Sequence, residues 1–318
     1  MKLSQLVAYR NALDRFTVAS VRDQSVIELQ KIVFETIMRP SKFDDVSAAM
    51  QSDIDEIKLS FDRFDHDLQR LKKAINTEIE HVGQQYFAES YRMYEQEMIH
   101  EPVQWVLDRR MPLSQEAETL LLARLQGNSD WRYPAMIIRP ATESFIEHLV
   151  SFDPLYILDH DHDLLRPAMQ RFPQNYQQRI RPYVISERDS DQVLGKIPDG
   201  QFGLCLVYNF FNYKPFEIIR RYLQEIFIKL RPGGVLYMTI NDCDRAHCVA
   251  LCEAHFTCYT PGGMIRDLAE SMGFRYHFAW TDGGNLSWVE LKKPGELTSL
   301  RGGQTLAKII EKPIAKSK

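Results

Sequence analysis

Polar side chains that could do chemistry stand just beyond several short apolar runs of this chain. Asp159 follows the run at 155–158, and Asn209 and Asp242 follow two later runs. In open parallel sheets, ligands bind beyond the carboxyl ends of the strands, where the strand order reverses. A carboxylate there can accept hydrogen bonds from both hydroxyls of a vicinal diol. His247 is a candidate general base close to Asp242 in sequence.

Two further groups of residues raise the question of a metal ion. His160 and His162 alternate with aspartates and would point the same way in an extended segment, a spacing that can chelate a divalent ion. The alternative is a polar loop that leads into a helix. Four cysteines stand at positions 243, 248, 252 and 258 without a Cys-x-x-Cys pair. This spacing favours reduced thiols over a zinc site, and we assign no residue to a metal.

An alternation of strand and helix patterns must position these side chains. The expected strands are 135–138, 155–158, 183–185, 202–207, 235–240, 274–280 and 286–291. The expected helices are 114–126, 143–150, 164–179, 215–230 and 262–272. The segment 282–285, Asp-Gly-Gly-Asn, predicts a hairpin turn between the last two strands. This order predicts an α/β protein whose sheet is mostly parallel, with one antiparallel strand at its end.

The first hundred residues have a helical pattern throughout. Apolar residues at helical spacing predict a helix over 1–38, which ends before Pro40. From Met50 to Ile75, apolar residues recur at alternating steps of four and three between charged residues, which predicts a heptad seam. We interpret this seam as a coiled coil that makes the protein a homo-oligomer through residues 46–82. The alternative is a long helix that packs on its own chain.

The composition narrows the class of protein. The 318 residues are 44% apolar and 26% charged, as in an ordinary globular protein, and the net charge of −4 gives no argument for nucleic-acid binding. No apolar run approaches the roughly 18–20 residues that span a bilayer, and because charged residues come early in the chain we expect no signal-peptide core. We expect a cytoplasmic protein. From Lys292 onward, seven basic residues face two acidic ones, so the tail is a candidate surface for a protein partner.

The stretch Leu230-Arg231-Pro232-Gly233-Gly234 joins a helix stop to a buried strand. Arginine suits a helix C-terminus, proline cannot continue the helix, and glycine tolerates positive φ. With Asn241-Asp242 at the far end of the strand, this segment resembles the turn into the fifth strand of class I S-adenosylmethionine-dependent methyltransferases. The resemblance covers about 131–295 and implies their Rossmann-like sheet. We therefore expect a helical and coiled-coil region at 1–110, a methyltransferase-like domain at 111–295 and a basic tail at 296–318.

The resemblance implies a site for S-adenosylmethionine beyond the first strands. The family has a glycine-rich loop after the first strand, whereas this chain has no glycine between Arg139 and Ser144. Asp159 matches the acid that accepts hydrogen bonds from the ribose, and Glu187 or Asp189 stands where a side chain contacts the adenine amino group. The expected cofactor-binding residues are Arg139, Ala141, Thr142, Glu143, Asp159, His160, Glu187, Asp189 and Tyr208.

The resemblance also implies a place for the methyl acceptor. Asn209 and its aromatic neighbours correspond to the motif that holds the target nitrogen in amino-group methyltransferases, although its two prolines are missing. The alternative is that Phe210 and Phe211 only pack against the following helix. In metal-dependent O-methyltransferases, oxygen ligands from these strand ends hold magnesium; here they would be Asn209 or Asn212, with Asn241 and Asp242. The expected catalytic residues are Asn209, Asp242 and His247.

Two functions follow from these observations. The first is methyl transfer from S-adenosylmethionine to an oxygen or nitrogen of an acceptor. The second is a non-catalytic structural or assembly protein that keeps the fold, has lost the cofactor and oligomerises through its coiled coil. Residues 293–309 and 241–247 resemble uncharacterised methyltransferase-like proteins of marine bacteriophages. That likeness implies the host cytoplasm or the virion as the location.

Overall fold

The computed structural model describes residues 2–15, 44–98, 114–139, 144–187, 192–254, 257–281 and 286–296. The chain forms two compact units, Met1–Gln84 and Gln85–Lys318. Of the helix expected over 1–38, α1 covers Leu3–Arg15, and the remainder lies outside the described residues. The predicted long helix is confirmed as α3, Asp44–Met93, which continues into a π-helical turn, η1, Tyr94–Met98. The residues from 99 to 113 lie outside the described residues.

In the first unit, the apolar residues of α3 differ in exposure. Leu68 and Ile79 are buried, and because they are eleven residues apart they lie on one face of the helix. Beside this face, Lys72 Nζ lies 3.3 Å from Asp14 Oδ1 of α1. Phe64 and Leu71, seven residues apart on the other flank, are 53% and 48% exposed. One part of the seam is therefore covered within the chain, and oligomerisation through 46–82 stays a prediction.

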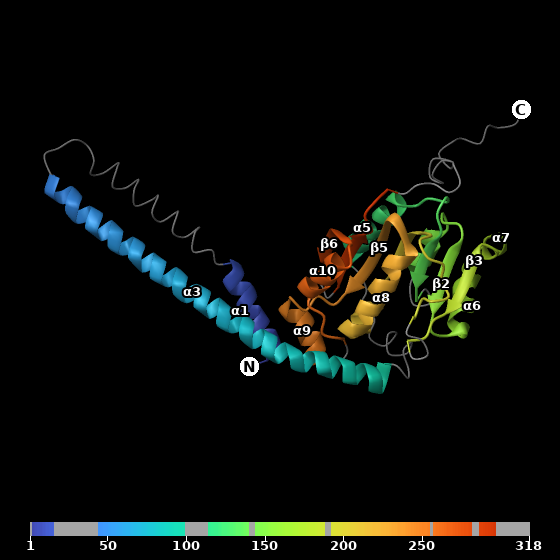
Figure 1. The fold of residues 1–318 in the computed structure, drawn as a ribbon, viewed down its shortest axis with the longest axis horizontal. Coiled ribbons are helices and arrows are strands. Elements are labelled where there is room, and N and C mark those ends of the chain that lie inside the picture. The colour runs from blue at the N-terminus through green and yellow to red at the C-terminus, as the bar shows by residue number, and fades with distance from the viewer. Residues whose placement is uncertain are drawn as a thin grey trace, which may run out of the picture. The chain divides into compact units, whose positions relative to one another are not determined.

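The second unit is built on a seven-stranded sheet with the order β3-β2-β1-β4-β5-β7-β6 among the described residues (Figure 1). Strands β1 to β5 are parallel to their neighbours, and β7 is antiparallel to both β5 and β6. The strands are β1 Ala135–Ile138, β2 Leu155–Asp159, β3 Ile180–Val184, β4 Phe202–Val207, β5 Leu230–Ile240, β6 Arg275–Thr281 and β7 Ser287–Lys292. The predicted mostly parallel α/β sheet with an antiparallel hairpin is confirmed.

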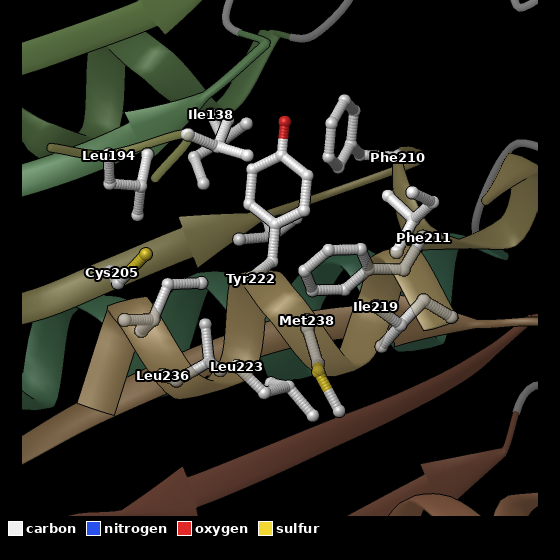
Figure 2. Close-up of a cluster of buried hydrophobic side chains, with 14 of the residues drawn as sticks. Ile138, Leu194, Cys205, Phe210, Phe211, Ile219, Tyr222, Leu223, Leu236 and Met238 are labelled. Carbon is white, nitrogen blue, oxygen red and sulfur yellow. The ribbon is translucent and has the colours of Figure 1, made fainter. Parts of the chain in front are cut away.

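Helices cover both faces of this sheet. They are α5 Gln115–Gly127, η3 Ser144–Leu149, α6 His162–Gln170, α7 Gln174–Gln177, η4 Phe211–Tyr213, α8 Phe216–Lys229, α9 Ala246–Glu253 and α10 Gly262–Ser271. Successive residues of β1 serve opposite faces: Met136 and Ile138 belong to the cluster that contains α8 and α10, and Ala135 and Ile137 to the one that contains α5 and α6. Figure 2 shows the first cluster around Tyr222. None of the described helices is long and apolar enough to cross a membrane.

Three local predictions were wrong. The third strand is 180–184 rather than 183–185, because it is an edge strand with exposed residues and a proline, which hide the apolar pattern. The segment expected as an α-helix at 143–150 is the 3₁₀ helix η3. The expected division of 164–179 at its prolines is confirmed at Pro173, which separates α6 from α7, whereas Pro167 lies inside α6. The antiparallel strand β7 lies inside the sheet and β6 forms its edge.

We predict that replacing Phe64 and Leu71 together by glutamine lowers the mass of the assembly without loss of helix. Truncating buried apolar side chains costs about 2–5 kcal/mol, which weakens self-association at least tenfold. Light scattering at low micromolar concentration measures the mass, and circular dichroism measures the helix.

The matched control is Leu59→Gln, which changes a residue of α3 that is 51% exposed on another face. An unchanged mass in the double variant would mean that this flank of α3 does not contact a second copy.

Candidate functional site at the carboxyl edge of the sheet

Four strands of the sheet deliver polar residues to one edge. Because β1 pairs with both β2 and β4, the strand order reverses between β1 and β4, and this is where ligands bind in such sheets. Arg139 follows β1, Asp159 ends β2, Glu187 follows β3 and Asn209 follows β4. Thus the topology brings together residues that are far apart in the sequence.

Asp159 is a buried carboxylate with a spare acceptor. Its side chain is 0% exposed, and Oδ1 accepts a hydrogen bond of 2.8 Å from the backbone N–H of His160. Oδ2 is buried and has no hydrogen-bond partner among the described residues. Burial raises the pKa of Asp159, while the nearby guanidinium of Arg139 opposes the shift. A buried oxygen in this state favours a donor brought by a ligand or water.

Glu187 is the centre of the polar cluster at this edge. Its Oε1 accepts from Tyr222 at 2.7 Å and lies 3.2 Å from His160 Nε2. Its Oε2 accepts from Lys214 Nζ at 2.7 Å and from the hydroxyl of Tyr94. Figure 2 shows the Tyr222 ring standing on α8 with its hydroxyl directed away from the helix. With two partners on each oxygen, the acceptor sites of this carboxylate are filled.

The charges in this cluster determine which of its side chains are ionised. Burial alone would raise the pKa of Glu187, but the ammonium of Lys214 and the hydrogen bond with His160 hold it well below its usual range. Burial lowers the pKa of Lys214 and of His160. At neutral pH, Glu187 is therefore ionised and His160 is neutral.

Arg139 occupies the first position after β1. Its backbone has φ 62°, in the left-handed region, and its N–H donates to Leu158 O at 2.7 Å. The side chain is buried, with the guanidinium carbon 5.4 Å from the centre of the Phe210 ring. The same ring has Lys214 Nζ at 4.9 Å and stacks on the His160 ring at 5.7 Å. The Phe210 ring therefore contacts two cationic side chains and one imidazole ring, in addition to its packing against α8.

The proposed acceptor residues lie on the β4 and β5 side of the edge. Asn209 is buried with φ 47°, and its backbone N–H donates to Thr239 Oγ1 at 2.8 Å. The Thr239 hydroxyl in turn donates to Asn212 Oδ1 at 3.2 Å. Tyr208 packs edge to face on Phe145, within the cluster on the opposite face of the sheet.

Asp242 accepts hydrogen bonds from the backbone, and His247 is exposed. Asp242 Oδ1 accepts from the backbone N–H groups of Asp244 at 3.1 Å and Gly262 at 3.0 Å, so this carboxylate holds the start of α10. A Cβ atom on Gly262 would lie 2.5 Å from that oxygen, which explains the glycine there. His247 is exposed on α9. The structure does not test the catalytic roles of these residues.

Four of the residues expected to bind the cofactor cannot be placed, and no metal site is found among the described residues. Ala141, Thr142, Glu143 and Asp189 lie outside the described residues. No group of three or more histidine, cysteine or acidic side chains within the described ranges is arranged to hold a metal ion. Asn241 Nδ2 instead contacts its neighbours, Cys248 O and Thr257 Oγ1 at 3.1 Å each.

Sequence reasoning missed three members of the Glu187 cluster, namely Tyr94, Lys214 and Tyr222. Tyr94 begins the π-helical turn η1, and such turns are frequent at functional sites. Lys214 could have been noticed as a lone cation in an aromatic loop after a strand. No local pattern marks Tyr222, which lies on the buried face of α8.

A cavity of about 580 Å³ adjoins this edge of the sheet. Val184 and Ile185 line it, and Val184 is the register partner of Asp159 across the β2 and β3 pair. The backbone N–H of Ile185 donates to Asp159 O at 2.9 Å. The volume lies within the range of pockets that hold small molecules.

The strand order, with β7 antiparallel between β5 and β6, is that of class I S-adenosylmethionine-dependent methyltransferases, and the chain has this fold. No protein-family model and no curated protein matches the chain. Among solved structures, the N-methyltransferase NodS from Bradyrhizobium japonicum WM9 in complex with S-adenosyl-L-homocysteine is 20% identical over 64% of this chain and 98% of that one, with a TM-score of 0.46.

Two other structures have nearly the same TM-score at lower identity. A possible exported protein from Bordetella parapertussis is 16% identical over 60% of this chain and 72% of that one, with a TM-score of 0.45. Geranyl diphosphate C-methyltransferase from Streptomyces coelicolor A3(2) is 10% identical over 56% and 79%, also with a TM-score of 0.45. At these identities and TM-scores, the likenesses carry no argument about activity.

We predict that Lys214→Met lowers the free energy of unfolding by about 3–5 kcal/mol, because removing one partner of a buried ion pair leaves the other charge uncompensated. The control is Lys229→Met, which breaks a 2.6 Å pair with the largely exposed Asp199 and costs about 0–1 kcal/mol. Denaturant unfolding measures both. Equal losses in the two variants would contradict the central place of the Glu187 cluster.

Proposed function

We propose that this chain binds S-adenosylmethionine at the carboxyl edge of the sheet and catalyses methyl transfer to an oxygen or nitrogen acceptor. The observation that carries the proposal is the buried Oδ2 of Asp159, which has no hydrogen-bond partner in the described part of the chain. It ends β2 beside the point where the strand order reverses. A ribose diol would supply the missing donors.

Asp159 fits its expected part of this cofactor, whereas Glu187 does not. Asp159 fits the ribose, and the cavity that Val184 and Ile185 line lies at the end of the neighbouring strand β3. Glu187 does not fit the adenine amino group, since both of its oxygens already hold two partners each. The roles expected of Ala141, Thr142, Glu143 and Asp189 stay predictions.

The chain's part in the reaction would be orientation. Bound S-adenosylmethionine supplies an activated methyl group, and the transfer needs mainly proximity and alignment of the acceptor atom. The backbone N–H of Asn209, at the end of β4, is held by Thr239 Oγ1. We assign Asn209 to positioning the acceptor, and Asp242 to the capping of α10.

A second candidate function is supported by Arg139. Its buried guanidinium lies over Phe210, at the strand end where the family has its glycine-rich loop. A cation buried there favours a domain that has filled its cofactor site and kept the fold for a structural or assembly role. The phage and virion assignments, and a protein partner for the basic tail, belong to this candidate.

We predict that S-adenosylhomocysteine binds the native chain and that Asp159→Ala weakens the binding roughly ten- to a hundredfold. Losing a hydrogen bond to a charged group costs about 1.5–3 kcal/mol. Isothermal titration calorimetry measures the affinity. The matched control is Asp161→Ala, which removes the same charge from the exposed cap of α6. Equal binding by native and Asp159→Ala protein would show that the site is wrongly placed.

A double variant separates the two candidate functions. Pro140→Gly with Ala141→Gly restores the glycine content of the family's loop. On the methyltransferase proposal, the native chain already binds and the double variant changes the affinity little. If the native chain shows no heat with millimolar ligand and the double variant gains binding, the non-catalytic candidate replaces the first.

A further inference from the structure

His160 follows Asp159 in the sequence. One nitrogen of its ring is within hydrogen-bond distance of a carboxylate, and the other has no partner among the described residues. Its Nε2 lies 3.2 Å from Glu187 Oε1. An ionised carboxylate only accepts hydrogen bonds, so Nε2 must carry the proton. In the neutral imidazole, Nδ1 is then an unprotonated acceptor. Glu187 thus determines the tautomer of His160 through one hydrogen bond.

The Nδ1 atom is buried and has no hydrogen-bond partner in the described part of the chain. Asp159 Oδ2, on the preceding residue, is in the same condition. The two residues are consecutive at the end of β2, and the backbone N–H of His160 donates to Asp159 Oδ1 at 2.8 Å. When Asp159 is ionised, both atoms are acceptors, so neither can satisfy the other. A partner for the pair must bring two donors.

The imidazole is also held in place. Its ring stacks on Phe210 with centres 5.7 Å apart and planes 28° from parallel. Glu187 is itself fixed by Tyr94, Lys214 and Tyr222. A ring fixed on its face and at Nε2 presents Nδ1 in one direction, as a binding site requires.

We propose that His160, oriented by Glu187, is a second hydrogen-bond acceptor for the ligand, so that Asp159 Oδ2 and His160 Nδ1 together recognise the vicinal diol of its ribose. The inference rests on the proposed function, because the diol belongs to the adenosyl ligand. It adds a specificity-determining residue to the site, and it makes Glu187 a positioning residue rather than a ligand contact.

The test uses His160→Phe, which keeps a ring to stack on Phe210 and removes both nitrogens, and His160→Asn, whose amide oxygen can stand in for Nδ1. The probes are S-adenosylhomocysteine and its 2′-deoxy and 3′-deoxy derivatives, titrated by calorimetry. We expect His160→Phe to bind S-adenosylhomocysteine about tenfold more weakly than the native chain and His160→Asn to recover most of the loss. One of the two deoxy derivatives should bind His160→Phe as well as S-adenosylhomocysteine does.

Several outcomes would overturn the inference. If Asp159→Ala loses binding while His160→Phe binds as tightly as the native chain, Nδ1 is satisfied by water and only the proposed function survives. If the native chain does not bind, both fail. If His160→Phe loses its circular dichroism signal, the variant does not fold and the native chain tests the inference instead. Both deoxy derivatives must then bind the native chain about tenfold more weakly than S-adenosylhomocysteine does. Equal binding of either one contradicts a two-acceptor site.

Discussion

The buried carboxylate of Glu187 ties the carboxyl edge of the sheet together. Its four partners come from η1, the end of β2, the loop after η4 and the middle of α8. An ionised group taken out of water is costly unless every acceptor site is used. The fold therefore has to bring these four elements to one point, and the position of each is constrained by the others. Even the end of the long helix α3 is included, because Met93 and Tyr94 are part of the core.

The same constraint explains why two acceptors remain open at this edge. Lys214 satisfies Glu187. Burial raises the pKa of Asp159, and the nearby guanidinium of Arg139 opposes that shift. The charges of the cluster are thus balanced without a ligand, yet Asp159 Oδ2 and His160 Nδ1 have no hydrogen donors from the described residues. Balanced charge with open acceptors suits a neutral donor such as a hydroxyl.

Local sequence patterns predict the parallel sheet and the place of Asp159 well. A buried strand must end where its apolar run ends, so the residue that follows it is fixed at the sheet edge. The Glu187 cluster could not be predicted in this way. Tyr94 and Tyr222 are 93 and 35 residues from Glu187, and their meeting depends on tertiary packing. The strand before Glu187 was also misplaced, because the exposed edge strand β3 with Pro182 carries little apolar signal. The heptad pattern predicted α3 correctly, but not which of its residues the chain itself covers.

Hydrogen–deuterium exchange with and without S-adenosylhomocysteine tests the central claim most directly. Bound ligand should slow exchange in peptides that cover 155–162 and 183–187, since the ends of β2 and β3 flank the proposed site. Peptides from α5, on the other side of the sheet, should exchange at the same rate in both samples. If saturating ligand leaves the β2 and β3 peptides unchanged, or protects a different part of the chain, the site does not lie at this edge.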